Sequence, residues 1–227
     1  GTVVTTLKID DMLAMRRLPN IVTNYAGQVG QAVATAPSTK KTVNIYGVSA
    51  SYLDIDTGKV AEGGRFFTEE EDNSTARVVV LGADVAHDLF ADQNPVGQVV
   101  KLKQKNFQVI GVFERRGASL FLNFDAFVYI PVQTLQKQLT GTSYVSFITS
   151  KYKDKAKVKE TVADVTDLLR NRHHLTSGDP DKDDFVVQTT DDVAGTLDTV
   201  IGGFTLLLVA LAGISLVVGG VGIMNIM

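Results

Sequence analysis

The feature that most constrains this chain is its uncharged, apolar end, residues 201–227, which reads IGGFTLLLVALAGISLVVGGVGIMNIM. A helix needs about 20 apolar residues to cross the hydrocarbon core of a bilayer, and this stretch exceeds that length. A helix buried in a soluble core is usually shorter and carries polar residues. The pattern therefore predicts a transmembrane helix over residues 199–227.

Small residues recur along one side of the predicted membrane helix. Ala212, Ser215, Gly219 and Gly222 follow one another at intervals of three and four residues, which places them on one face. In lipid, such a stripe lets another helix approach closely, whereas a simple anchor needs no stripe. We therefore expect these four residues to form a helix-packing face within a bundle.

The charged residues, 22 basic and 25 acidic, all lie at or before Asp198, so this polar part is expected to fold around its own core. The formal net charge is −3, and with no basic surplus we expect no nucleic-acid partner. The chain has no cysteine, which excludes thiol catalysis, cysteine-ligated zinc and disulfide bonds.

Hydrophobic periodicity predicts an α+β fold for the polar part. Gly27 and Gly30 suggest a bend or bulge in the first strand. We expect a platform built from residues 1–62 and 140–198, with a mainly β insertion at residues 63–139. The predicted strands are residues 21–34, 42–49, 77–81, 100–103, 107–113, 127–130, 144–149 and 185–188, and the predicted helices are residues 10–18, 83–90, 131–139 and 154–173.

Candidate metal ligands are few. His173 and His174 are adjacent, whereas two histidines that bind one metal from a helix are spaced by three or four residues, so an exposed helix end is the better interpretation. The run GDPDKDD, with acidic residues Asp179, Asp181, Asp183 and Asp184, imitates the start of a calcium loop. It lacks the glycine and glutamate that such a loop requires at its sixth and twelfth positions. A solvated turn before a strand suffices.

Two further charged runs have simple interpretations. Glu69, Glu70, Glu71 and Asp72 follow Thr68 and predict a capped helical turn or an acidic loop. The alternating lysines of residues 151–159 are interleaved with acidic residues, which favours a solvated face over binding to anionic lipid or cell wall. The sequence contains no phosphate-binding loop and no nucleophile elbow, so the residues alone indicate no catalytic activity and no cofactor.

Several stretches nevertheless match a known family in order and spacing. They are VNIYGVSASYLDI, GGRFFTEEED, ARVVVLGADVAHDLFADQNPVGQVVKLKQKNFQVIGVFE, FVYIPVQTLQKQL, LLRNRHHL with the following DDFVV, and VVGGVGIMNIM. On these stretches the chain resembles the MacB-type ABC transporter permeases of the FtsX-like permease group. The first forty residues match only loosely.

The resemblance implies a fold and a setting. It implies a porter-like α+β subdomain formed by residues 1–62 and 140–198, with the β-rich subdomain of residues 63–139 inserted in it. It also implies that residues 1–198 are extracytoplasmic, that Gly1 lies just after a first transmembrane helix, and that residues 199–227 are the second of four.

The same resemblance implies partners and a mechanism. Two permease copies, identical or different, would pair with cytoplasmic ABC ATPase subunits or domains that bind the ATP. A periplasmic adaptor or membrane-fusion protein and the membrane lipid would be further partners. ATP hydrolysis would drive export or extraction of a substrate by transmitting movement across the membrane, and no catalytic residue would lie in this chain.

The sequence is also compatible with three other functions: a membrane-anchored sensor or binding ectodomain, an anchored enzyme, and an FtsX-like regulator of cell-wall hydrolases. The sequence that follows Met227 in the parent protein would discriminate. A permease predicts two further spanning helices there, whereas a receptor predicts a signalling domain.

Overall fold

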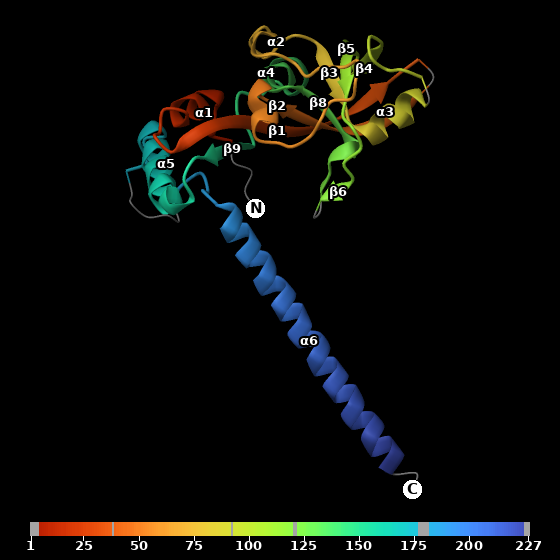
Figure 1. The fold of residues 1–227 in the computed structure, drawn as a ribbon, viewed down its shortest axis with the longest axis vertical. Helices are drawn as coiled ribbons and strands as arrows, with labels where there is room; N and C mark the ends of the chain where they lie inside the picture. Colours follow the sequence, from red (N-terminus) through yellow and green to blue (C-terminus); the bar gives the residue numbers. More distant parts are fainter. Residues whose placement is uncertain (1–4, 38, 92, 120–121, 177–181, 225–227) are drawn as a thin grey trace. The chain divides into compact units, whose positions relative to one another are not determined.

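The computed structural model describes residues 5–37, 39–91, 93–119, 122–176 and 182–224, with backbone alone at residues 118, 119, 122 and 217–224. It is an α+β structure followed by one long helix, as predicted (Figure 1). The elements in chain order are α1 (Ile9–Met15), β1 (Ile21–Thr35), β2 (Lys40–Val48), η1 (Ala50–Asp54), α2 (Glu69–Asn73), β3 (Val78–Leu81), α3 (Ala83–Phe90), β4 (Val99–Leu102), β5 (Lys105–Val112), β6 (Ala118–Ser119), β7 (Leu122–Asn123), η2 (Phe124–Ala126), β8 (Phe127–Pro131), α4 (Val132–Thr134), η3 (Leu135–Thr140), β9 (Phe147–Tyr152), η4 (Lys155–Lys157), α5 (Val158–Arg172) and α6 (Thr190–Met224).

The main sheet has seven strands in the order β2-β8-β3-β5-β4-β1-β9. An additional pairing between β1 and β2 closes six of these strands into a ring, with β9 attached outside it. In this ring, strands of the predicted insertion pair with strands of the predicted platform. For example, β8, within residues 63–139, pairs with β2, within residues 1–62. The division into two subdomains at residues 63 and 139 stays a prediction.

Strand β1 connects the six-strand ring to β9. Its first half, Ile21–Gly27, pairs with β9, and its second half, from Gly27 onward, pairs with β2. Helices α1 and α5 lie beside the β9 end of the sheet, whereas α3 lies near β4 and β5 (Figure 1). Gly27 lies at this change of partners, and the register shift in β1 lies earlier, between Ile21 and Thr23. The prediction of a bulge at Gly27 and Gly30 is therefore wrong, and the alternative prediction, a bend there, stays a prediction.

Strand β3 is buried on both faces, as its continuous apolar sequence predicts. Val79 and Leu81 belong to an aliphatic core that also contains residues of α3. Val78 and Val80 belong to a second core rich in tyrosine and phenylalanine. Because consecutive side chains of a strand point to opposite faces, β3 separates these two cores.

The strands predicted at residues 100–103 and 107–113, with a turn at residues 104–106 between them, correspond to the hairpin of β4 and β5, which has a shorter turn. Leu102 pairs with Lys105, so only Lys103 and Gln104 form the turn, and both have positive φ. Two left-handed residues match the twist of a two-residue hairpin. The expected turn at residues 104–106 thus begins one residue earlier.

Several predicted boundaries are wrong. The helix expected at residues 131–139 is a short α-helix followed by a π-helix, η3, which ends at the left-handed Gly141. The strand expected at residues 144–149 is Phe147–Tyr152, and the helix expected from residue 154 begins at Val158 after a 3₁₀ turn. Residues 185–188 form no strand. Strand-like local sequence is insufficient there, because a strand also needs a hydrogen-bonded partner and none of the described strands pairs with these residues.

Contacts divide the chain into a globular unit, residues 1–185, and a second unit, residues 186–227, which contains α6. Helix α6 starts at Thr190, earlier than the predicted residue 199. The reason is local, because Thr189 caps the helix: its hydroxyl accepts the N–H of Asp192 at 3.1 Å, and Asp192 accepts the N–H of Thr189 at 2.8 Å. Within α6, residues 190–216 are long and apolar enough to cross a membrane.

Candidate functional site

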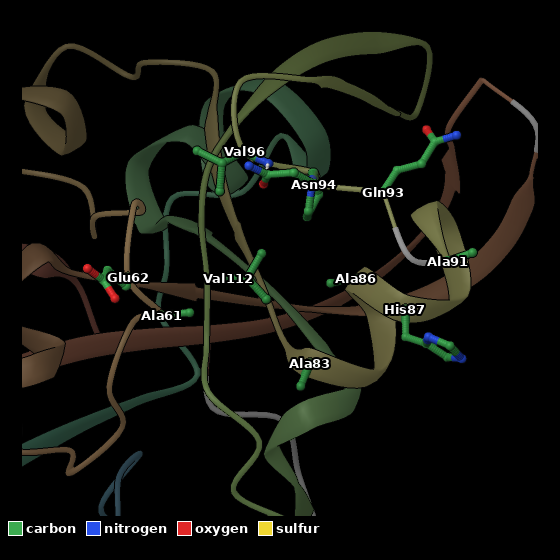
Figure 2. Close-up of a pocket in the computed structure, with 11 residues that line it drawn as sticks. Ala61, Glu62, Ala83, Ala86, His87, Ala91, Gln93, Asn94, Val96 and Val112 are labelled. Atoms are coloured by element: carbon green, nitrogen blue, oxygen red, sulfur yellow. Dashed lines mark hydrogen bonds between the residues drawn. The ribbon is translucent and has the colours of Figure 1, made fainter.

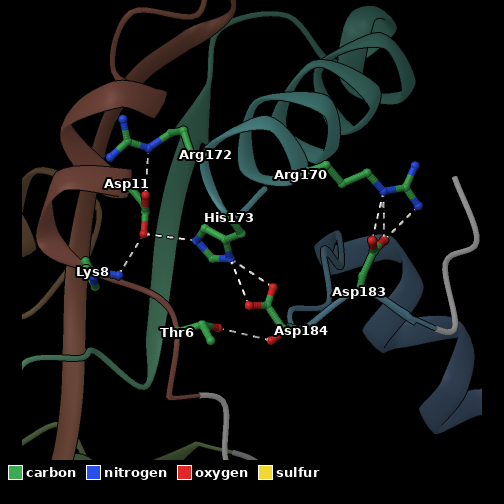
Figure 3. Close-up of polar contacts among 8 residues, drawn as sticks. All are labelled: Thr6, Lys8, Asp11, Arg170, Arg172, His173, Asp183 and Asp184. Atoms are coloured by element: carbon green, nitrogen blue, oxygen red, sulfur yellow. Dashed lines mark hydrogen bonds and ion pairs between the residues drawn. The ribbon is translucent and has the colours of Figure 1, made fainter. Parts of the chain in front are cut away.

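A connected polar site in the globular unit lies where three segments meet: the chain around α1, the C-terminal end of α5, and residues 182–185 (Figure 3). We call residues 182–185 the exit segment because the chain leads from them to α6. We call the charged side chains of this site the junction cluster. The cluster consists of Asp11, Arg170, Arg172, His173, Asp183 and Asp184.

Asp11 anchors the α1 side of the junction cluster. In the first turn of α1 its carboxylate accepts the backbone N–H of Lys8 at 2.8 Å, which caps the helix, and the Nε of Arg172 at 2.7 Å. Its side chain is only 4% exposed. Burial by itself raises the pKa of Asp11, but the hydrogen bonds from Arg172, Lys8 and His173 outweigh burial and lower that pKa below its ordinary value.

His173 lies at the centre, directly after the last residue of α5. Its Nδ1 is 2.9 and 3.1 Å from the two carboxylate oxygens of Asp184, and its Nε2 is 3.3 Å from Oδ2 of Asp11. Its ring is nearly perpendicular to that of Phe185, with 5.8 Å between the ring centroids. The side chain is 8% exposed, so the predicted exposed position of His173 is wrong.

The pKa of His173 reflects two opposing effects. Burial disfavours the imidazolium and lowers the pKa, while the hydrogen bonds and negative charges of Asp184 and Asp11 raise it, and the net effect is a raised pKa. Both carboxylates thus favour the charged form of the ring.

A second ion pair attaches the exit segment to α5. Arg170 donates from Nε at 2.9 and 3.1 Å and from Nη2 at 2.7 Å to the carboxylate of Asp183, a fork-like arrangement. On the other side, the Thr6 hydroxyl donates to the carbonyl of Asp184 at 3.4 Å. The exit segment is therefore held both by α5 and by the residues before α1.

The solvated acidic turn predicted from GDPDKDD is wrong for Asp183, which forms an ion pair with Arg170, and for Asp184, whose carboxylate contacts the ring of His173. Asp179 and Asp181 lie outside the described residues. Among the residues that the structure describes, no group of histidine and acidic side chains is arranged to hold a metal ion. In the junction cluster the two ring nitrogens of His173 point in opposite directions, so its two carboxylates cannot share one cation with it (Figure 3).

Sequence reasoning missed the junction cluster because its members are far apart along the chain: Asp11 and His173 are separated by 162 positions. A signal was present in two of the stretches that carry the family resemblance, LLRNRHHL and DDFVV. They contain the cations and the carboxylates that meet in the fold.

A pocket of about 320 Å³ lies between α3 and the loop that precedes β4 (Figure 2). Its wall is mainly small and apolar, with Ala83, Ala86 and Val112 among its residues. The His87 ring points away from Ala86 and Val112, and Glu62 lies on the far side of the pocket from it in the view of Figure 2. The pocket thus brings no acid and base together on one substrate position.

The acidic run at residues 69–72 confirms the predicted capped turn. Thr68 accepts the N–H of Glu71 at 3.2 Å, and Glu71 pairs with Arg65 at 2.7 Å. Asp72 is buried, and its carboxylate accepts the N–H of Gln133 at 3.1 Å. Burial is the main cause that raises the pKa of Asp72 to about 6. The lysines of residues 151–159 are exposed, in agreement with a solvated face.

The predicted packing stripe lies on α6. Ala212 and Ser215 are exposed, as are large apolar residues of the same helix such as Leu206 and Leu216. Gly219 and Gly222 lie in the part of α6 of which the structure describes the backbone alone. The helix-packing role of the four residues stays a prediction.

The globular unit is an α+β domain, and the chain continues from it into one helix that is long and apolar enough to cross a membrane. Residues 2–168 match the family model described as the MacB-like periplasmic core domain. The chain belongs to this family of MacB-type ABC transporter permease ectodomains, which confirms the resemblance stated from the sequence.

Named relatives support the assignment. The chain is 33% identical, over 225 residues, to the "Macrolide export ATP-binding/permease protein MacB" of Neisseria meningitidis serogroup A, with 99% of this chain and 34% of that protein covered. It is 37% identical over 164 residues to the MacB of Bdellovibrio bacteriovorus, with 72% and 25% covered. The chain therefore spans about a third or less of the length of these relatives.

Solved structures agree on the fold. The periplasmic region of MacB from Actinobacillus actinomycetemcomitans has a TM-score of 0.73 and 26% identity, with 86% of this chain and 84% of that chain covered. The extracellular domain of the ABC-type transporter YknZ from Gram-positive bacteria has a TM-score of 0.66 at 21% identity, with 74% and 84% covered. The second likeness shows the fold alone.

Proposed function

We propose that this chain is the extracytoplasmic domain and one membrane helix of an ABC transporter permease. The permease couples ATP hydrolysis on the cytoplasmic side to export or extraction of a substrate at the outer face of the membrane. The observation that carries this proposal is the match over 99% of the chain to a protein named an export ATP-binding/permease protein, which includes the membrane helix as well as the ectodomain.

The partners follow from that proposal. A cytoplasmic ABC ATPase, as a subunit or a domain, binds the ATP, and this chain needs no cofactor and performs no catalysis. A second permease copy completes the transporter, and lipid surrounds α6. A periplasmic adaptor or membrane-fusion protein is a further proposed partner.

Two structural features support a mechanical role. Only residues 186–189 separate Phe185, the last residue of the globular unit, from Thr190, the first residue of α6. Movement of the membrane helix therefore acts on the exit segment through a very short connection. The junction cluster then passes the force to α5 and α1 through charge-assisted hydrogen bonds, which are short and directional.

The proposal that α6 packs against other helices and moves with them is tested by substitutions in the stripe of small residues. Gly219→Leu and Gly222→Leu place a bulky side chain where we propose that another helix packs closely. In the full-length permease with its ATPase, reconstituted in proteoliposomes, these substitutions should reduce substrate-stimulated ATP hydrolysis and transport. Assembly is measured in parallel by size-exclusion chromatography.

Gly213→Leu is the matched control, because at about 100° per residue Gly213 lies on the side of α6 away from the stripe. The structure places no other residue within 4 Å of a Cβ there. Full activity and unchanged assembly of the stripe variants would contradict the packing role. A permease that neither stimulates an ATPase nor moves any substrate would contradict the transport function itself.

A further inference from the structure

His173 is placed between two acceptors. Asp11 and Asp184 lie against its two ring nitrogens, at 3.3 and 2.9 Å, and a carboxylate only accepts hydrogen bonds. A neutral imidazole has one N–H, so it donates to one carboxylate and turns a lone pair toward the other. The imidazolium has two N–H groups and donates to both.

We propose that the junction cluster is a proton-controlled latch: protonated His173 clasps Asp11 of α1 to Asp184 of the exit segment, and the neutral ring releases one of them. The latch is closed when both ring nitrogens donate. It opens when loss of the proton turns one contact into a repulsion between lone pairs.

The charges that face His173 from each neighbouring element favour this behaviour. From α1 comes Asp11, whose carboxylate is shared with the guanidinium of Arg172 and the backbone N–H of Lys8. Asp183 and Asp184 come from the exit segment, and Arg170 and the adjacent His174 come from the end of α5. Within the junction cluster three carboxylates face two guanidinium groups, so a proton on His173 balances the charge.

Burial increases the free-energy cost of losing a hydrogen bond between His173 and one of its carboxylates. The His173 side chain is 8% exposed and that of Asp11 is 4% exposed, so water compensates little for a lost contact. The Arg170–Asp183 pair keeps the exit segment near α5 while the contact between His173 and its acid is lost. Asp11 keeps its bonds from Arg172 and from the backbone N–H of Lys8, so Asp184 is the carboxylate that is free to move away. Opening thus leaves the exit segment with the Arg170–Asp183 pair and the weak Thr6 contact, and the domain stays folded.

The direction of the pH effect follows from the raised pKa of His173. The closed latch is fully formed below the ordinary pKa of histidine, about 6.5, and is lost as pH rises through the raised value. The opening equilibrium changes about tenfold for each whole unit that separates the pKa of His173 in the closed and open states. Acidity outside the membrane therefore stiffens the connection to α6, a consequence that rests on the proposed function, whereas the latch itself does not.

The test uses the full 227-residue chain in lipid nanodiscs, with ¹⁵N relaxation and the histidine ring resonances followed by NMR between pH 5 and pH 9. The chain has three histidines, and His87→Gln and His174→Gln assign the His173 resonance. We expect residues 182–185 to be rigid at low pH and mobile at high pH, with a midpoint equal to the pKa of His173.

Three variants make the test specific. His173→Gln should leave the exit segment mobile at every pH, because the amide carries no charge. His173→Arg should leave it rigid at every pH, because the guanidinium stays protonated. Asp184→Asn should move the His173 titration to lower pH. The amide of Val80, in the buried strand β3, reports whether each variant is folded.

Mobility of residues 182–185 that does not change with pH in the unmodified chain would overturn the latch. So would a pH dependence that persists in His173→Gln. Neither measurement involves transport, so failure of the latch leaves the proposed function untouched, and failure of transport leaves these results standing.

Discussion

The ring of Phe147 in β9 lies directly against the backbone of Gly27 in β1. A Cβ built on Gly27 would lie 2.1 Å from Cζ of Phe147, a distance that atoms in contact do not reach. The two residues are also register partners, at the point where β1 changes from β9 to β2. The glycine thus lets the aromatic core extend across this change of partner.

The first prediction concerns this contact. Gly27→Ala should lower the free energy of unfolding by about 1–3 kcal/mol, because the added methyl displaces the ring in a packed core. Urea unfolding followed by tyrosine fluorescence measures the change, since the chain has six tyrosines and no tryptophan.

Gly30→Ala on the same strand is the matched control. Its Cβ would meet Leu135 at 3.6 Å, an ordinary contact, so it should be neutral or stabilise by about 0.4–1 kcal/mol. Gly27→Ala combined with Phe147→Leu should recover part of the loss. Equal effects of the two alanine substitutions would argue against the packing explanation.

The second prediction contrasts two neighbouring arginines. Arg116 pairs with Asp56 at 2.7 Å, and the two side chains are 20% and 15% exposed. Arg115 pairs with Asp84 at 2.6 Å, but its side chain is 65% exposed. Asp56→Ala should cost about 3 kcal/mol, the lower end for a broken buried pair, because some solvent contact remains.

Asp84→Ala should cost at most about 1 kcal/mol, because an exposed pair is screened by water. Thermal unfolding of the two variants, monitored by circular dichroism, provides the comparison. A loss for Asp84→Ala as large as that for Asp56→Ala would show that burial does not set the strength of these pairs.

The third prediction concerns pH and Asp72. Its pKa is about 6 in the folded chain, compared with 3.8 when unperturbed. Between those values the unfolded chain releases a proton that the folded chain keeps, so stability falls as pH rises, by up to about 3 kcal/mol above pH 6. Asp72→Asn removes this loss while its Oδ1 still accepts the N–H of Gln133.

Chemical unfolding at pH 4 and pH 8 tests this prediction. The asparagine variant should be the more stable at pH 8, and the difference should shrink at pH 4. A variant that is less stable than the unmodified chain at pH 8 would mean that the charged carboxylate stabilises the fold after all.

The fourth prediction concerns the start of α6. Thr189→Ala removes the hydroxyl that caps the helix and should cost about 1 kcal/mol locally. Amide hydrogen exchange at Asp192 and Val193 in micelles should then become roughly fivefold faster, the factor that corresponds to this energy. Thr196→Ala, about two turns beyond Thr189, keeps the cap and should leave these amides unchanged.

Local sequence determined the features that depend on neighbouring residues. The uncharged run after Asp198 gives a membrane-length helix, because length and apolarity alone satisfy the bilayer requirement. The run Val78–Leu81 is a buried strand because it is continuously apolar, and Thr68 begins a capped turn because Glu71, three residues later, completes the capping box. The hydrophobic periodicity predicted the α+β class, and the six matching stretches, in their order along the chain, predicted the family.

Only the tertiary structure decided the features that depend on distant partners. Residues 185–188 have strand-like sequence but pair with none of the described strands. The sequence predicts a bend or bulge near Gly27, whereas the fold shows that Phe147 packs against this glycine. Likewise His173 reads as an exposed helix end, yet the fold buries it between Asp11 and Asp184. Burial and charge pairing are set by residues that are remote in the chain, so the pattern around one residue does not contain them.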